Sequence, residues 1–194
     1  MGKDFTSALR PAIVLTLLFA ALLGIAYPLA MTGIGQLAFP AQANGSLISD
    51  GDHIIGSALI GQGFASDRYF HSRPSAAGKG YDGLASAGSN LGPASQALSD
   101  RVTADVAALN SSAQGRNIPP DLVTASASGL DPHISPEAAL FQIDRVARAR
   151  RLPTATVRAQ VDQAIERPLF GILGEPRINV LLLNRALDAQ ERGR

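Results

Sequence analysis

An uncharged apolar segment near the N-terminus limits what this chain can fold into. No Asp, Glu, Lys or Arg occurs between Arg10 and Asp50, and residues 12–31 are mostly Ala, Leu, Ile and Val. Twenty helical residues span about 30 Å, the thickness of the hydrocarbon core of a bilayer. The sequence therefore predicts a transmembrane helix over residues 12–32.

A secretory signal peptide is the alternative interpretation, because Ala41-Gln42-Ala43 resembles a small-residue cleavage site. The apolar run exceeds the roughly 7–15 residues of a signal core, and the Ala-x-Ala lies well beyond its end. These two features favour a retained anchor. Both interpretations leave the rest of the chain on the same side of the membrane.

The charges that flank the helix predict its orientation. Lys3 and Arg10 precede the helix, and the next Lys or Arg is Arg68. Cytoplasmic flanks carry the excess of basic residues, so the N-terminus is expected inside. We therefore expect a cytoplasmic N-terminus at 1–11, the membrane helix at 12–32, a linker at 33–43 and one extracytoplasmic domain at 44–194.

Composition excludes several classes of chemistry. The 194 residues provide for one domain with an appendage, and the absence of cysteine excludes disulfides, thiolate metal sites and a Cys nucleophile. Seventeen Lys and Arg balance 16 Asp and Glu, so no overall field attracts nucleic acid. We expect no nucleic-acid partner.

The remaining pattern predicts an α+β fold. Residues 39–92 are rich in Gly, Ser and Pro, and two β-compatible runs at 46–48 and 53–60 predict a hairpin. Apolar residues then recur at helical spacing in three segments, and a last helix is expected from Pro176 to about Gln190. Pro93, Pro136 and Pro176 are expected in first helical turns, with Ser135 as an N-cap. The predicted architecture is three or four helices packed on a small β-sheet.

No motif in the chain predicts catalysis or a metal site. His53, His71 and His133 lie far apart, without the spacing of metal ligands, and no Gly-x-Ser-x-Gly elbow is present.

Arginines gather in the second half of the chain, and two interpretations of them stay open. An exposed helix face with an Asp144–Arg148 ion pair is the ordinary one. Contact with an acidic partner surface is the alternative, and ATP binding is less favoured. The residues are Arg145, Arg148, Arg150, Arg151 and Arg158.

Seven strings give a more specific signal. They are F-P-A-Q-A-N-G-S-L-I (39–48), G-S-A-L-I-G-Q-G-F (56–64), Y-F-H-S-R-P-S-A (69–76), G-S-N-L-G-P (88–93), L-V-T-A-S-A-S-G-L-D-P-H-I-S-P-E-A-A (122–139), R-V-A-R-A-R (145–150) and L-G-E-P-R-I-N-V-L-L-L-N-R-A-L-D (173–188). In this order they resemble the C subunit of the bacterial potassium-transporting Kdp ATPase, a P-type pump complex, over essentially the whole chain.

The resemblance implies a non-catalytic accessory subunit of the bacterial inner membrane, needed for assembly and activity of a high-affinity potassium uptake pump. The implied partners, besides membrane lipid, are an A subunit that selects potassium, a B subunit that hydrolyses ATP, and a small F subunit. The C subunit of this family is described as raising the pump subunit's affinity for ATP. No tightly bound cofactor is expected, and ATP is a possible ligand only through the complex. In agreement, the aspartyl-phosphate motif D-K-T-G-T is absent from the sequence.

An extracytoplasmic domain would be separated from cytoplasmic ATP, so we expect an indirect effect through a shared conformational equilibrium. Direct nucleotide or partner contact would fall on Gln142, Arg145 and Arg148. Six further candidates for structural or partner contacts lie within the strings, namely Asn44, Gln62, Arg73, Asn90, Asp131 and His133. Two other function classes remain open, an anchored or exported hydrolase that uses a histidine such as His133, and a solute-binding protein.

Overall fold

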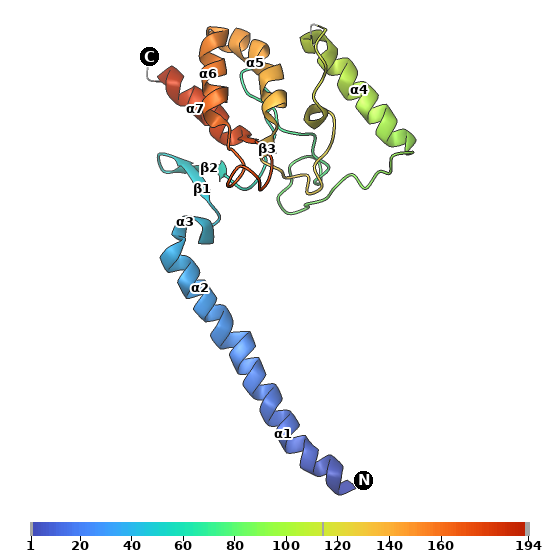
Figure 1. Cartoon of the computed structure of the whole chain (residues 1–194), viewed down its shortest axis with the longest axis vertical. Helices are drawn as coiled ribbons and strands as arrows, with labels where there is room; N and C mark the ends of the chain where they lie inside the picture. The colour runs from blue at the N-terminus through green and yellow to red at the C-terminus, as the bar shows by residue number, and fades with distance from the viewer. Residues whose placement is uncertain (1, 114, 193–194) are drawn as a thin grey trace. The chain divides into compact units, whose positions relative to one another are not determined.

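The computed structural model describes residues 2–113 and 115–192, and the chain divides into two compact units, residues 1–47 and 48–194. The first unit is one long helix followed by a short one. Helix α1 (Gly2–Ala21), a π-helical turn (Leu22–Ala26) and α2 (Tyr27–Ala38) are continuous, and α3 (Pro40–Ala43) follows (Figure 1).

Residues Thr6–Ala38 of this helix are long and apolar enough to cross a membrane. At about 1.5 Å per residue, its 33 residues extend roughly 50 Å. The helix therefore continues past the sequence-predicted span of 12–32 at both ends.

The π-helical turn ends at Ala26, two residues before Pro28. Proline has no N–H to donate to the carbonyl four residues earlier, and its ring crowds that carbonyl. Here the N–H of Tyr27 donates to the carbonyl of Leu22, five residues back. The wider turn accommodates the proline without ending the helix.

The second unit confirms the predicted α+β class. The strands form two separate two-stranded sheets, β1 with β2 and β3 antiparallel to β4, where a single small sheet was expected. The elements are β1 (Leu47–Asp50), β2 (His53–Ser57), α4 (Gln96–Ala113), a 3₁₀ turn (Pro120–Leu122), β3 (His133–Ile134), α5 (Pro136–Arg150), α6 (Thr154–Ala164), β4 (Ile178–Asn179) and α7 (Val180–Arg192).

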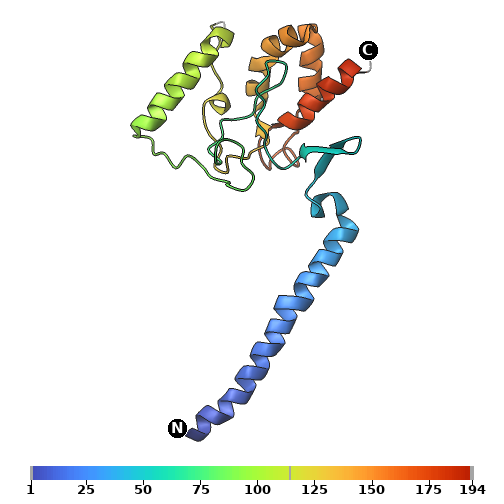
Figure 2. The ribbon, with the colours of Figure 1, turned by 180° about the vertical axis from the view of Figure 1, so that it is seen from behind.

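The core lies where α5, α6 and α7 meet, and both views show these helices grouped together, with α4 on the other side of long loop segments (Figures 1 and 2). Ser135 caps α5 as predicted, because its Oγ accepts a hydrogen bond from the N–H of Ala138 at 3.2 Å. Such a cap contributes about 1 kcal/mol. The largest fully buried apolar side chains are Phe70, Ile134, Ile178, Leu183, Leu187, Val146, Val157, Val161 and Val180.

Two of the expected helix starts are wrong. Helix α7 begins at Val180 and not at Pro176, because Ile178 pairs with Ile134 in the β3–β4 sheet before the helix starts. Helix α4 begins at Gln96, so Pro93 lies outside its first turn.

The expected Asp144–Arg148 pair is also replaced. The carboxylate of Asp144 lies 3.3 Å from the guanidinium of Arg116, which follows α4 in the chain. A tertiary partner therefore takes the place of the intrahelical one.

Candidate functional site

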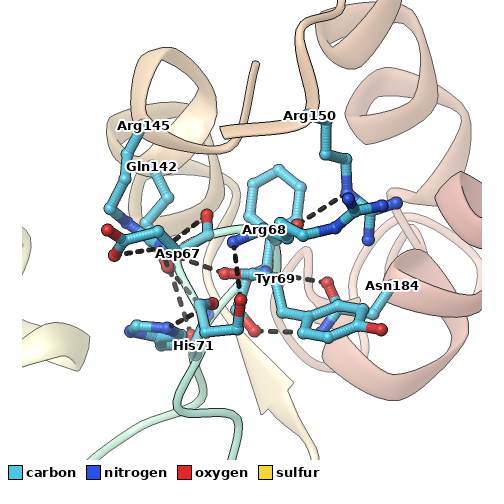
Figure 3. Close-up of polar contacts among 10 residues, drawn as sticks. Asp67, Arg68, Tyr69, His71, Gln142, Arg145, Arg150 and Asn184 are labelled. Atoms are coloured by element: carbon cyan, nitrogen blue, oxygen red, sulfur yellow. Dashed lines mark hydrogen bonds and ion pairs between the residues drawn. The ribbon is translucent and has the colours of Figure 1, made fainter. Parts of the chain in front are cut away.

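The segment 67–71, here called the bracketed segment, lies between α5 and α7 (Figure 3). The side chain of Phe70 is fully buried, and its backbone is held by Asn184 of α7. The N–H of Phe70 donates to Oδ1 of Asn184 at 2.7 Å, and Nδ2 of Asn184 donates to the carbonyl of Phe70 at 3.0 Å. One buried amide thus satisfies both backbone groups of a buried residue.

The next residue is held in the same way from the other side. The N–H of His71 donates to Oε1 of Gln142 at 2.8 Å, and Nε2 of Gln142 donates to the carbonyl of His71 at 3.1 Å. A further bond from Nε2 reaches the carbonyl of Ala138 at 3.2 Å, within α5. Two carboxamides therefore serve the function that neighbouring strands serve in a sheet.

Arg145 extends this bracket along the segment. Its guanidinium donates to the carbonyls of Asp67 and Tyr69 at 2.9 and 3.0 Å, and to Oε1 of Gln142 at 2.7 Å. Burial lowers the pKa of Arg145, and the nearby Asp67 carboxylate opposes this. Arg148, one turn further on, is exposed.

Arg150 joins the segment to the end of α7. Its Nε donates to the carbonyl of Arg68 at 2.6 Å, and its guanidinium lies 5.1 Å from the ring centroid of Tyr69. The carboxylates of Asp188 and Glu191 lie 2.8 and 3.2 Å from its Nη1. The side chain of Arg150 has no exposed area, so this is a buried charge with two carboxylate partners.

A cavity of about 520 Å³ opens beside the bracketed segment. Its lining carries both signs of charge, which does not select an anionic or a cationic ligand. Burial lowers the pKa of His71, with a further contribution from the positive charge of Arg145, and the hydrogen bond to Ser66 and the Asp67 carboxylate oppose this. Charged and polar lining residues include Asp67, His71, Asp105, Gln142, Asp144, Arg145 and Arg148.

Three of the sequence-predicted candidates come together in a second place, here called the Arg73–Asp131–His133 cluster. Nη1 of Arg73 lies 3.7 Å from Asp131, and Nδ1 of His133 lies 3.4 Å from the same carboxylate. The N–H of His133 also donates to the Asp131 carboxylate at 3.0 Å. Hydrogen bonds from His133 and the charge of Arg73 lower the pKa of Asp131.

The bend at Gly129 brings this loop against other segments. Gly129 has φ +67°, and a Cβ there would lie 2.6 Å from the backbone nitrogen of Ala77. Gly61 permits a similar approach, because its N–H donates to the carbonyl of Leu130 at 2.7 Å and a Cβ would lie 2.5 Å from the Asp131 carbonyl. Only glycine fits at these two positions, because any other residue would place a Cβ against the neighbouring backbone.

Three other candidates lie apart from both groups. Asn44 belongs to the first unit, where its Nδ2 donates to the carbonyl of Pro40 at 2.7 Å. Gln62 donates to the carbonyl of Ile55 at 3.2 Å, beside β2. Asn90 is exposed in a left-handed conformation, with φ +51°.

Asn184 is the bracket residue that the sequence analysis missed. It is 2% exposed and lies on the buried face of α7, between Leu183 and Leu187. An amide at a core position of an amphipathic helix was the available signal, because buried polar side chains need partners.

These arrangements hold loops in place and assemble no catalytic group. Among residues 2–113 and 115–192, no set of three or more His, Cys, Asp or Glu is placed to hold a metal ion. An apolar helix long enough to span a membrane, joined to such a domain, is the architecture of a single-pass membrane protein.

The chain belongs to the family of the K+-transporting ATPase c chain, whose model matches residues 9–189. It is 58% identical over 185 residues to the potassium-transporting ATPase KdpC subunit of Caulobacter vibrioides (strain NA1000 / CB15N), covering 95% of this chain and 94% of that one. The KdpC subunit of Allorhizobium ampelinum is 54% identical over 184 residues, covering 94% and 96%. The KdpC subunit of Bradyrhizobium diazoefficiens is 54% identical over 192 residues, covering 93% and 96%. The chain is thus a non-catalytic subunit of the Kdp ATPase, and this replaces the hydrolase and solute-binding alternatives.

Proposed function

We propose that the chain is required for assembly and activity of the Kdp complex in the bacterial inner membrane, together with its A, B and F subunits. In this proposal it raises the apparent ATP affinity of the pump subunit without binding ATP itself. Membership in the c-chain family supports the assignment to the complex.

Gln142 and Arg145 already use their polar groups in hydrogen bonds within the domain, which supports an indirect effect on ATP affinity. Gln142 is 4% exposed, its Nε2 donates two hydrogen bonds, and its Oε1 accepts two. Arg145 donates to two backbone carbonyls. A nucleotide could contact these side chains only by breaking the bracket, and unpaired buried groups are costly. Arg148 remains exposed, but a single guanidinium is a weak basis for a nucleotide site.

The proposed topology also separates the domain from ATP. Lys3 and Arg10 lie before the uncharged run of residues 11–49, and no Lys or Arg follows this run before Arg68. The positive-inside rule supports a cytoplasmic N-terminus and an extracytoplasmic second unit. An effect on ATP use then acts through a conformational equilibrium that both sides of the complex share.

A nucleotide experiment tests the indirect mechanism. The purified full chain in detergent should show no saturable binding of ATP, whereas its addition to the A, B and F subunits should lower the KM for ATP hydrolysis. Arg148→Ala should leave that KM unchanged. Saturable ATP binding by the chain alone, abolished in Arg148→Ala, would contradict the proposal.

A reporter experiment tests the topology. Alkaline phosphatase, which is active only outside the cytoplasm, should be active when fused after Arg194 and inactive when fused before Met1. The reverse pattern would place the second unit in the cytoplasm, where ATP is present, and the topology would then no longer oppose direct contact between the domain and ATP.

A further inference from the structure

An apolar hairpin, residues 166–177, connects α6 to β4. At its base the N–H groups of Glu166 and Arg177 donate to each other's carbonyls at 2.8 and 3.1 Å. Nearer the tip, Leu169 and Leu173 pair in the same way at 3.1 and 3.0 Å. The hairpin is therefore ordered by its own backbone before any partner binds, which reduces the entropy cost of binding.

The tip of the apolar hairpin exposes four large apolar side chains. Together they present on the order of 500 Å², comparable with the largest apolar patch of a typical soluble monomer, which is often functional. The exposed fractions are 62% for Leu169, 84% for Phe170, 80% for Ile172 and 57% for Leu173.

The backbone of Phe170, at the tip of the apolar hairpin, has a strained conformation that no packing of its side chain offsets. Phe170 has φ +55°, in the left-handed region, which a bulky non-glycine residue rarely adopts. Its ring is largely exposed, so packing within the second unit does not offset the strain. Backbone strain of this kind recurs at sites of function. The exposed ring is therefore available for a contact outside the domain.

The surroundings of the tip favour a protein over a lipid surface. One wall of a hollow of about 600 Å³ is the apolar hairpin, and the other includes the Arg73–Asp131–His133 cluster. Charges on the hairpin are mixed: Arg177 pairs with Glu166 at 2.9 Å, and Arg167 is balanced by Glu175. An apolar centre with a polar rim is typical of protein interfaces, whereas loops that bind anionic membranes carry clustered basic residues.

We propose that the apolar hairpin docks into an apolar hollow on the outward-facing surface of a membrane-embedded subunit of the same complex. The proposal rests on the proposed function, because it takes the second unit to be extracytoplasmic. The Arg73–Asp131–His133 cluster lies at the polar edge of this surface, where paired charges select the orientation of the partner.

Phe170→Asn tests the docking in the full complex. Asparagine tolerates a left-handed backbone, so the unfolding temperature of the full chain should stay the same or rise. Co-purification with the large subunits should fall about tenfold or more, as for the loss of a central interface residue. Leu84→Asn is the matched control, because Leu84 is 101% exposed in another loop and should tolerate the change. Wild-type co-purification by Phe170→Asn would overturn the docking proposal and leave the proposed function standing, whereas failure of the unaltered chain to co-purify would overturn both.

A spin label separates a protein pocket from lipid. The chain has no cysteine, so Phe170→Cys provides a single labelling site. On assembly of the complex in phosphatidylethanolamine and phosphatidylglycerol vesicles, accessibility to both oxygen and a water-soluble nickel chelate should fall. High oxygen accessibility with low nickel accessibility would show insertion into lipid and overturn the proposal.

Discussion

Replacement of Asn184 by Leu tests whether the amide bracket holds the second unit together. The side chains are similar in size, but Leu removes both bonds to Phe70, at 2.7 and 3.0 Å, and leaves a buried N–H and C=O unpaired. Each orphaned group costs about 1–3 kcal/mol, and the added apolar burial returns roughly 1 kcal/mol. We expect a net loss of about 3 kcal/mol, a large part of the roughly 5–15 kcal/mol that stabilises a typical domain.

Urea unfolding of the full chain in detergent, followed by far-ultraviolet circular dichroism, measures this loss. The matched control is Asn110→Leu, the same substitution at an exposed position of α4, which should change stability by less than about 0.5 kcal/mol. Asn184→Asp adds a second signature, because its loss of stability should shrink at acid pH, where the carboxylic acid can donate to the Phe70 carbonyl. If Asn184→Leu unfolds at the same urea concentration as the control, the two bonds to Phe70 contribute no net stability.

Three further predictions concern the same unit. Gly129→Ala should lower the free energy of unfolding in urea by about 2 kcal/mol or more, because the added Cβ would lie 2.6 Å from two backbone atoms. Gly115→Ala is the control, because Gly115 has φ +80° but open space around it, and this change should cost about 1 kcal/mol. Equal losses for the two variants would exclude the clash as the cause. Burial lowers the pKa of His71 below its ordinary 6.5, so the unfolded chain binds the proton more readily than the folded chain does. The stability linked to this proton is present above about pH 6.5 and is lost as the pH falls through the folded-state pKa. His71→Asn should therefore flatten the change in melting temperature between about pH 7 and pH 5. Arg150→Met should destabilise by about 3 kcal/mol, because the Arg68 carbonyl loses its donor and the Asp188 and Glu191 carboxylates lose the buried charge that faces them. Arg158→Met at an exposed site should stay within about 0.5 kcal/mol, and similar melting temperatures for the two variants would remove Arg150 from the bracket.

Local signals in the sequence were sufficient for several parts of this protein. The uncharged apolar run predicts the long helix, and Ser135-Pro136 predicts the capped start of α5, because caps and apolar periodicity act within a few residues. Pro176 does not specify a helix start, since proline fits both a first helical turn and an extended segment. The segment is extended because Ile178 pairs with Ile134, which lies 44 positions earlier in the chain.

The sequence by itself determined the membrane helix, the α+β class and, through its seven strings, the family. Only the tertiary structure decided what the polar side chains do. Gln142 and Arg145 resemble ligand contacts in the sequence, yet they hold a backbone more than 70 positions away. The left-handed Phe170 and its exposed neighbours likewise appear in the sequence as an ordinary apolar run. The physical reason is that hydrogen-bond partners and exposure depend on which distant segments the fold brings together, and no local pattern of residue types contains that information.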